Sequence, residues 1–214
     1  MIYSGLNAGQ IAFIIIVPVV VLLIVFLAIY FPLRNKKMKT DYKYFYYKRL
    51  YKLAMDKDYY LINNFLFKID DAHVGRIDHI LFGDKYIYII NDIYYDGDIE
   101  GKENDQSIIL INRNGKKNYE DNPILNNRKI ANKLSLITGI NPSLIIGICM
   151  INDNCRCSVQ NSSKSFYIIQ SSNFSKLVKA IESRDIGVIN KEQLASAVKA
   201  INKLNRRKRQ SGQQ

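Results

Sequence analysis

Residues 76–93 read RIDHILFGDKYIYIINDI, and this stretch decides the fold. It holds two apolar, β-branched and aromatic runs, Arg76–Phe82 and Lys85–Ile93, on either side of a turn that begins at Gly83. Such runs bounded by Gly and Asp are typical of β-strands joined by a tight turn. Similar runs at Tyr59–Phe67 and Ser107–Ile111 extend the pattern on both sides. We therefore predict a meander of β-strands, with a further turn at residues 95–98.

Helical signals follow the meander. Residues 121–123 offer an N-cap with a proline in the first turn, Ile130, Leu134 and Ile137 form an apolar stripe, and Gly139 follows as a stop. Two more strands are predicted at residues 144–151 and 166–170, and two more helices at about 174–184 and 191–206, the last with Asn190 and Gln193 as a capping box. This alternation predicts an α/β domain.

The N-terminal segment has a different character. Its first 33 residues contain no Lys, Arg, Asp or Glu, and nearly every residue from Ile11 to Phe31 is apolar. A helix of roughly 20 such residues can cross the hydrocarbon core of a bilayer. No basic n-region or small-residue cleavage site of a signal peptide is visible. We predict a membrane anchor at about residues 11–32, and the basic residues that follow place the N-terminus outside and the remainder in the cytoplasm.

The positive charge is concentrated in two arms. Formal net charge is +12, but residues 53–202 carry equal numbers of acidic and basic side chains. The excess lies after the apolar segment and at the C-terminus, at Arg34, Lys36, Lys37, Lys39, Arg206, Arg207, Lys208 and Arg209. Residues 41–55, rich in Tyr and Lys, have the spacing of an amphipathic helix. Basic residues beside a membrane are attracted to anionic lipid, so we expect lipid contact, with nucleic acid as the second candidate partner.

The central motif resembles the NERD family, the nuclease-related domain, which is assigned to the restriction-endonuclease-like fold. Ile77-Asp78-His79 matches the start of the family's motif strand. Asn122-Pro123 with Asn126-Asn127 resembles its Asn-Pro helix start, and Tyr59–Asn64 its opening strand. The resemblance covers residues 59–205. It implies a central mixed sheet flanked by helices, here behind a transmembrane helix.

The resemblance also implies where a nuclease site would lie. Active relatives hold divalent cations between an Asp and a Glu on neighbouring strands, with a Lys two residues after the Glu. Asp78 occupies the Asp position, whereas Asn91 and Ile93 occupy the Glu and Lys positions. Asp92 is expected on the opposite strand face. The family's helical Glu falls near residues 44–46, where no acid stands and Asp41 is nearest. These losses predict an inactive site that needs no cofactor.

Two metal alternatives stay open. Asp96, Asp98 and Glu100 cluster after the second strand, with Lys85 in the preceding turn, so a relocated Mg²⁺ site with Asp78 is conceivable. The second alternative is a zinc site from Cys155 and Cys157 with Cys149 or one of the two histidines, although the spacing fits no standard ligand pair. A disulfide framework is not expected for these cysteines in a reducing cytoplasm.

The predicted organisation has four parts: an anchor segment (1–33), a basic neck (34–56), the NERD-like domain (57–205) and a frayed basic tail (206–214). The leading hypothesis is a membrane-anchored binding or scaffold module at the cytoplasmic face. A metal-dependent nuclease around Asp78 and an envelope-assembly or lipid-surface protein are the alternatives.

Overall fold

The computed structural model describes residues 8–68, 74–184 and 191–211. The chain divides into two units, Met1–Tyr42 and Lys43–Gln214. Helix α1 (Ala8–Lys57) runs through both, and Asp41 has non-helical backbone angles at the kink between its two halves.

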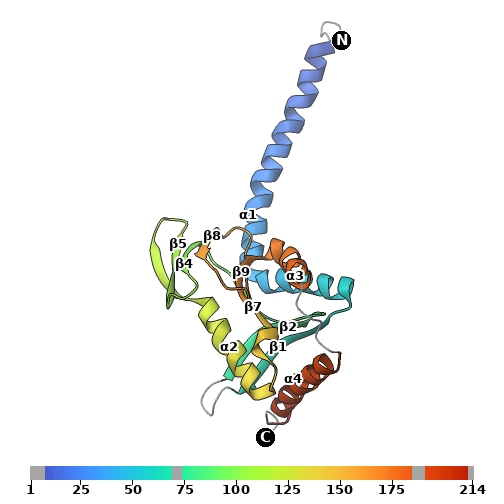
Figure 1. Ribbon diagram of the computed structural model, residues 1–214. Coiled ribbons are helices and arrows are strands. Elements are labelled where there is room, and N and C mark those ends of the chain that lie inside the picture. The colour runs from blue at the N-terminus through green and yellow to red at the C-terminus, as the bar shows by residue number, and fades with distance from the viewer. Residues whose placement is uncertain (1–7, 69–73, 185–190, 212–214) are drawn as a thin grey trace. The chain divides into compact units, whose positions relative to one another are not determined.

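The described part of the first unit, from Ala8, is helical. Within it, Phe13–Arg34 is long and apolar enough to cross a membrane, with a mean hydropathy of 3.3 over its most apolar window. Figure 1 shows this stretch as one helix. Its side chains are exposed from Phe13 to Arg34. A helix that is apolar all round and finds no protein partner among the described residues has the properties of a membrane-embedded segment.

The second unit contains two mixed sheets. The five-stranded sheet has the order β1-β2-β3-β7-β9, in which β1, β2 and β3 are antiparallel and β3, β7 and β9 are parallel. Its strands are β1 (Tyr60–Lys68), β2 (Val74–Phe82), β3 (Ile87–Ile93), β7 (Ile145–Ile151) and β9 (Phe166–Gln170). The four-stranded sheet has the order β6-β5-β4-β8, with strands β4 (Gly97–Lys102), β5 (Ser107–Asn112), β6 (Lys117–Asp121) and β8 (Cys157–Gln160).

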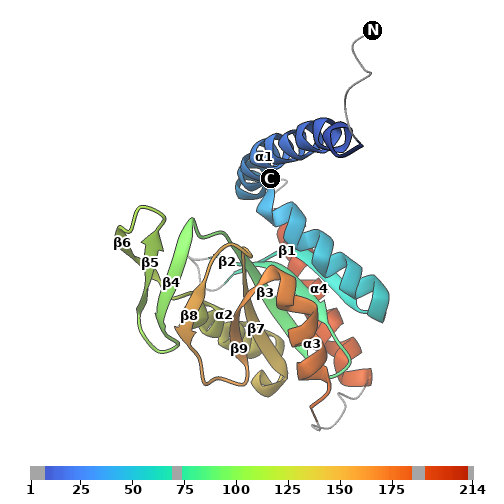
Figure 2. The same ribbon diagram turned by 90° about the horizontal axis from the view of Figure 1, so that it is seen from above.

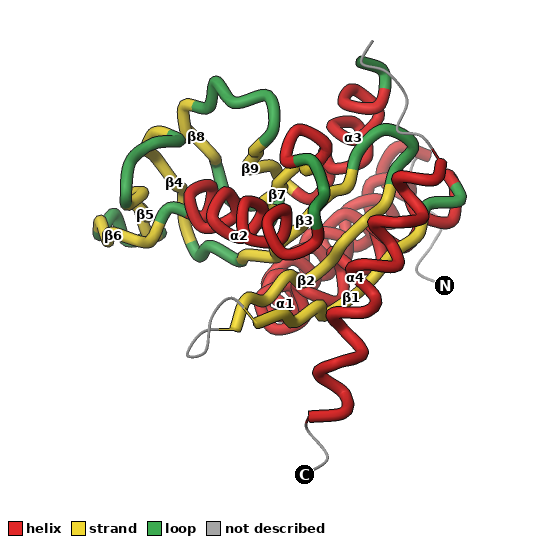
Figure 3. The backbone as a smooth tube through the Cα atoms, turned by 60° about the horizontal axis from the view of Figure 1, so that its bottom comes forward, coloured by secondary structure: helices red, strands yellow, loops and turns green. Residues whose placement is uncertain are grey.

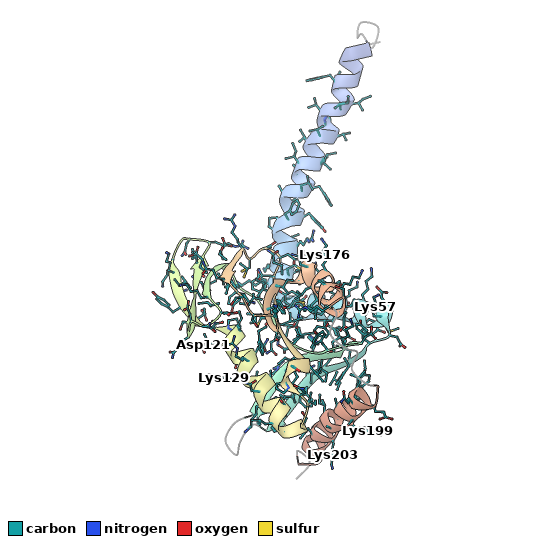
Figure 4. All side chains as sticks on the ribbon, in the orientation of Figure 1. Lys57, Asp121, Lys129, Lys176, Lys199 and Lys203 are labelled. Atoms are coloured by element: carbon teal, nitrogen blue, oxygen red, sulfur yellow. The ribbon has the colours of Figure 1, made fainter. Side chains whose placement is uncertain are left out.

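Helices cover both faces of the larger sheet (Figures 2 and 3). Helices α2 (Pro123–Thr138) and α4 (Lys191–Ser211) pack on one face, where Leu134 and Ile201 join a core cluster with Phe82 and Ile89. The second half of α1 and helix α3 (Phe174–Glu182) lie over the opposite face. The labelled lysines of these helices stand on their exposed faces (Figure 4). The predicted α/β class is confirmed.

The larger sheet has an interruption at Asn64. The ladder pairs Asn63 with His79 and Phe65 with Ile77 but is broken between these pairs, where Asn64 adopts a left-handed backbone with φ of 52°. Asn tolerates this conformation better than most residues. Ile62 and Phe65 both enter the same core cluster although simple alternation would put them on opposite faces. At the break, opposite Asp78, the alternation of side chains between the two faces of the sheet is therefore reversed.

Most predicted elements are confirmed, and several predictions are wrong. The cap of α2 is as expected, because the Asn122 side chain accepts from the Ile124 amide and Gly139 ends the helix with φ of 73°. The turn predicted at residues 95–98 instead runs into β4, and β6 and β8 were not predicted. The C-terminal tail predicted to be frayed is helical through Ser211. The predicted capping box at Asn190 lies outside the described residues.

Candidate functional site

The carboxylate of Asp78 is surrounded by positive charge. Its Oδ1 atom lies 3.0 Å from Lys43 Nζ and 3.0 Å from an Arg76 guanidinium nitrogen, and its Oδ2 atom accepts from the Asp92 amide at 3.0 Å. Burial raises the pKa of Asp78, but the Asp92 hydrogen bond and the Lys43 and Arg76 charges outweigh it, so the pKa lies below its ordinary value. Asp78 is therefore an ionised group whose two oxygens are both occupied by the protein.

The two other positions of the nuclease motif have structural contacts. Asn91 accepts from the Asp78 amide and donates to Asn127 of α2 at 2.5 Å, so its side chain fastens β2 and β3 to that helix. Ile93 packs against the apolar cluster that joins the two sheets, and its carbonyl accepts from the Tyr46 hydroxyl at 3.3 Å. Neither side chain offers a charge to a cation.

His79 and Asp92 form a buried pair on the face of the sheet opposite the Asn91 side chain. His79 Nε2 lies 2.9 Å from Asp92 Oδ2, its Nδ1 lies 2.6 Å from Asn63 Oδ1, and the Tyr47 ring stacks on the imidazole. Burial raises the pKa of Asp92, and His79 partly offsets that effect. The face that carries Asp92 thus contacts the second half of α1, whereas Asn91 contacts α2.

One oxygen of this pair has no partner. Asp92 Oδ1 is buried and makes no hydrogen bond to any described residue. Leaving a buried acceptor unsatisfied costs roughly 1–3 kcal/mol. Native structures rarely retain such a group without a water, an ion or a ligand to satisfy it.

A cavity of about 350 Å³ opens beside these groups. Asp78 and Asp92 both line this cavity. Strict strand alternation would separate them, but the break at Asn64 interrupts that alternation next to Asp78. The lining residues of the cavity are Lys43, Tyr44, Tyr47, Asn63, Asn64, Asp78, His79 and Asp92. Of these, only Asp78, His79 and Asp92 were prominent in the motif. The motif gave no reason to select Lys43, Asn63 or Asn64.

The acids proposed for a relocated metal site make other contacts. Asp96 pairs with Arg113, and Asp98 accepts from the Arg156 amide. Lys85 is held by the carbonyl of Arg184. Among the residues that the structure describes, no three His, Cys, Asp or Glu side chains gather as a metal site would require.

The cysteines and the basic arms occupy separate places. Cys149, Cys155 and Cys157 are free thiols, and burial raises the pKa of each. Lys36, Lys37 and Lys39 are exposed on the first half of α1, as is Arg34. Residues 206–209 form the end of α4, and their side chains lie outside the described part of the chain.

The fold and the position of Asp78 define a class, an α/β domain built like a nuclease around an Asp on a central hairpin. The chain belongs to the NERD (nuclease-related domain) family, whose sequence profile matches residues 43–152. The matched region begins at Lys43 and contains the whole of β1, β2, β3 and α2. No curated protein and no solved structure matches the chain.

Proposed function

We propose that this chain is a NERD-family binding module without nuclease turnover, held at the cytoplasmic face of a membrane by its N-terminal helix. The observation that carries the proposal is the engagement of Asp78. Its carboxylate is bonded by Lys43, Arg76 and the Asp92 amide, while the neutral Asn91 stands where active relatives have Glu.

The donor set does not fit a divalent cation. Mg²⁺ is bound through anionic oxygens such as carboxylates and substrate phosphates, and here two cations already share the Asp78 carboxylate. A metal would have to displace Lys43 and Arg76 to reach it, against their charge. We therefore assign no Mg²⁺ to this site and no catalytic step to Asp78.

The membrane part of the proposal rests on α1. Phe13–Arg34 has the length and composition of a spanning helix, and the basic residues at 34–39 follow it directly. Such residues favour the cytoplasmic side and attract anionic lipid. The basic end of α4 supplies a second cationic segment for lipid or nucleic acid.

The test is a cleavage assay on the full chain in lipid nanodiscs. Single- and double-stranded DNA and RNA are incubated with wild type and Asp78→Ala in Mg²⁺, in Mn²⁺ and in EDTA. We expect no difference among the six protein and cofactor combinations. Metal-dependent cleavage by wild type that Asp78→Ala abolishes would overturn the proposal and restore the nuclease reading.

A further inference from the structure

We propose that the cleft between strands β8 and β9 binds an extended peptide segment of a partner protein, which adds a strand between the two sheets. The inference names a class of partner for the proposed binding module and rests on the proposed function only in this respect. The cleft shares no lining residue with the cavity beside Asp78, so it is a second site. Open strand edges, an apolar floor and a balanced charge carry the inference.

Each sheet ends at the cleft with an unpaired edge. Strand β8 is the last strand of the four-stranded sheet, β9 is the last strand of the five-stranded sheet, and the two are not paired with each other. They lie side by side at the junction of the sheets (Figures 1 and 2). Open edges of this kind offer backbone N–H and C=O groups with which an added strand can pair.

In β8, the residues that direct their backbone groups into the cleft are Cys157 and Val159. The carbonyls of Arg156 and Gln160 accept hydrogen bonds from amides on the β4 side. Backbone groups alternate in direction along a strand, so those of Cys157 and Val159 point away from β4. Both residues line the cleft. The Val159 amide lies against the Cys157 thiol, a weak acceptor that a peptide carbonyl can replace.

In β9, Ile168 takes the same position. The carbonyl of Ser165 accepts from β7, so the backbone groups of Phe166 and Ile168 point away from that strand. At Phe166 the protein supplies the partners itself, because the Ser163 hydroxyl accepts from its amide at 3.1 Å and the Asn161 side chain donates to its carbonyl at 2.5 Å. Ile168 lies further along the same edge and lines the cleft, where an added strand would be the partner.

The floor of the cleft is an incompletely covered part of the apolar core. Cys157, Val159 and Ile168 pack against the cluster that joins the two sheets, yet each is only partly buried. The cleft has a volume of about 600 Å³. One residue of a packed strand occupies roughly 160 Å³ by the usual rise, strand spacing and sheet spacing, so about four residues can enter. Alternate side chains would cover the floor, so we expect an apolar residue at every second position of the segment.

The charges around the cleft favour an uncharged segment. Asp98, Asp153 and Arg156 line it, and Arg49 pairs with Asp153 at 2.9 Å. These two carboxylates and two guanidinium groups cancel, so the cleft offers no net charge to a nucleic-acid strand or to a metal ion. A peptide with neutral side chains can enter without leaving a charge unpaired.

The probe is a set of capped pentapeptides of the pattern Ser-X-Thr-X-Ser, in which each X is Val, Ile, Leu or Phe. Fluorescence polarisation of the labelled peptides with the full chain in nanodiscs should show saturable binding of at least one of them at concentrations up to about 1 mM. The same peptide with an N-methyl group on the central Thr amide should bind at least about tenfold more weakly, because methylation removes a strand hydrogen bond and leaves the side chains unchanged. A peptide with Asn at both X positions should also bind more weakly, because it cannot cover the apolar floor.

Val159→Pro should weaken binding from the protein side. Proline deletes the outward N–H and is tolerated where an edge strand has its N–H outside the ladder, so the pairing with β4 remains. We expect at least about tenfold weaker binding of the tightest peptide. The matched control is Val159→Thr, which keeps the amide and the β-branched shape and should stay within about threefold of wild type. Circular dichroism checks that both variants are folded.

The N-methyl comparison uses the wild-type chain, so it decides the inference even if Val159→Pro does not fold. Equal affinities of the methylated and unmethylated peptides, or no binding of any pentapeptide, would overturn the inference. A concentration-dependent dimer that Val159→Pro dissociates, and that no peptide enters, would assign the cleft to a second copy of the chain and would also overturn it. The cleavage assay is read separately, because a nuclease result at Asp78 would reject the proposed function without altering the binding of peptides at this cleft.

Discussion

Asp78 illustrates how neighbours decide the role of one residue. In active relatives its position implies a metal ligand, yet here it joins Lys43 of α1 to Arg76 and to the backbone of β3. Both cations are about half exposed, whereas the Asp78 side chain is 11% exposed. The same carboxylate that would serve catalysis therefore serves to hold a helix against the sheet.

The pH dependence of stability should report this role. The pKa of Asp78 is lower in the folded protein than its ordinary value of 3.8, so the stability it contributes is present above that value and is lost as pH falls through the lower folded pKa. At pH 7, Asp78→Asn should lower the free energy of unfolding by about 1–2 kcal/mol. Urea unfolding between pH 2.5 and 7 measures the difference, which should shrink toward the acid end.

Asp105→Asn is a matched control for this series, because Asp105 accepts a backbone hydrogen bond on the exposed β4–β5 connection and no cation is paired with it in the contacts we describe. Its effect should be small at every pH. A difference for Asp78→Asn that stays constant down to pH 2.5 would contradict the assignment of a lowered pKa.

At the scale of elements, the β2–β3 turn is fastened to the end of α3. Glu182 accepts from the Lys85 amide at 2.9 Å and from the Tyr88 hydroxyl at 2.7 Å. Gly83 makes this approach possible, since a Cβ at that position would lie 2.2 Å from Glu182 Oε1. The sequence assigns Gly83 only to a turn, but the close approach of Glu182 at the end of α3 also requires a glycine there.

Gly83→Ala should therefore destabilise the domain through Glu182. The added methyl group must displace the carboxylate and break its hydrogen bonds, at a cost of about 2 kcal/mol. A double-mutant cycle with Glu182→Ala, measured by urea unfolding, separates this effect from the nearby Tyr88 ring. The cost of Gly83→Ala should fall below about 1 kcal/mol in the Glu182→Ala background, and equal costs in both backgrounds would contradict the contact.

The same scale shows what the sequence could predict. Strands β2, β3 and β7 are buried apolar runs, and their patterns predicted them correctly. Strands β4, β6 and β8 are short, rich in polar residues and only partly buried, so they carry no hydrophobic pattern. They depend on pairing with β5 or with one another. The break at Asn64 gave no signal either, because it needs a local backbone inversion that no spacing encodes. Asp92 was consequently missed as a neighbour of Asp78. Lys43 was missed because it reaches Asp78 from a helix 35 residues earlier in the chain.

At the scale of the whole molecule, the amino-acid composition marks the boundaries between the parts of the chain but does not predict what each part does. An uncharged apolar helix, a basic segment and a domain with balanced charge follow one another along the chain. The balance of residues 53–202 argues against a domain that binds nucleic acid through bulk charge. Family membership was recognisable from the order of the motifs. Which side chains meet around Asp78 was not, because those contacts come from helix and strand faces that are distant in sequence.

The proposed anchor makes a prediction about location and orientation. If Phe13–Arg34 spans a membrane with the basic residues inside, the full chain expressed in a bacterial host should resist alkaline extraction from membranes. Protease should spare the domain in spheroplasts and digest it in inverted vesicles. Val21→Asp with Ile24→Asp should release the protein, because each acid costs about 2.5–3.5 kcal/mol at the centre of a spanning helix.

Val21→Leu with Ile24→Leu is the control and should remain inserted. Replacing Arg34, Lys36, Lys37 and Lys39 with Gln should keep the protein in the membrane but weaken its orientation, so that part of the population becomes protease-sensitive in spheroplasts. Release of the wild type at alkaline pH would contradict the anchor. Digestion of the wild-type domain in spheroplasts would leave the anchor intact and contradict only the orientation, because apolar length decides insertion whereas flanking charge decides direction.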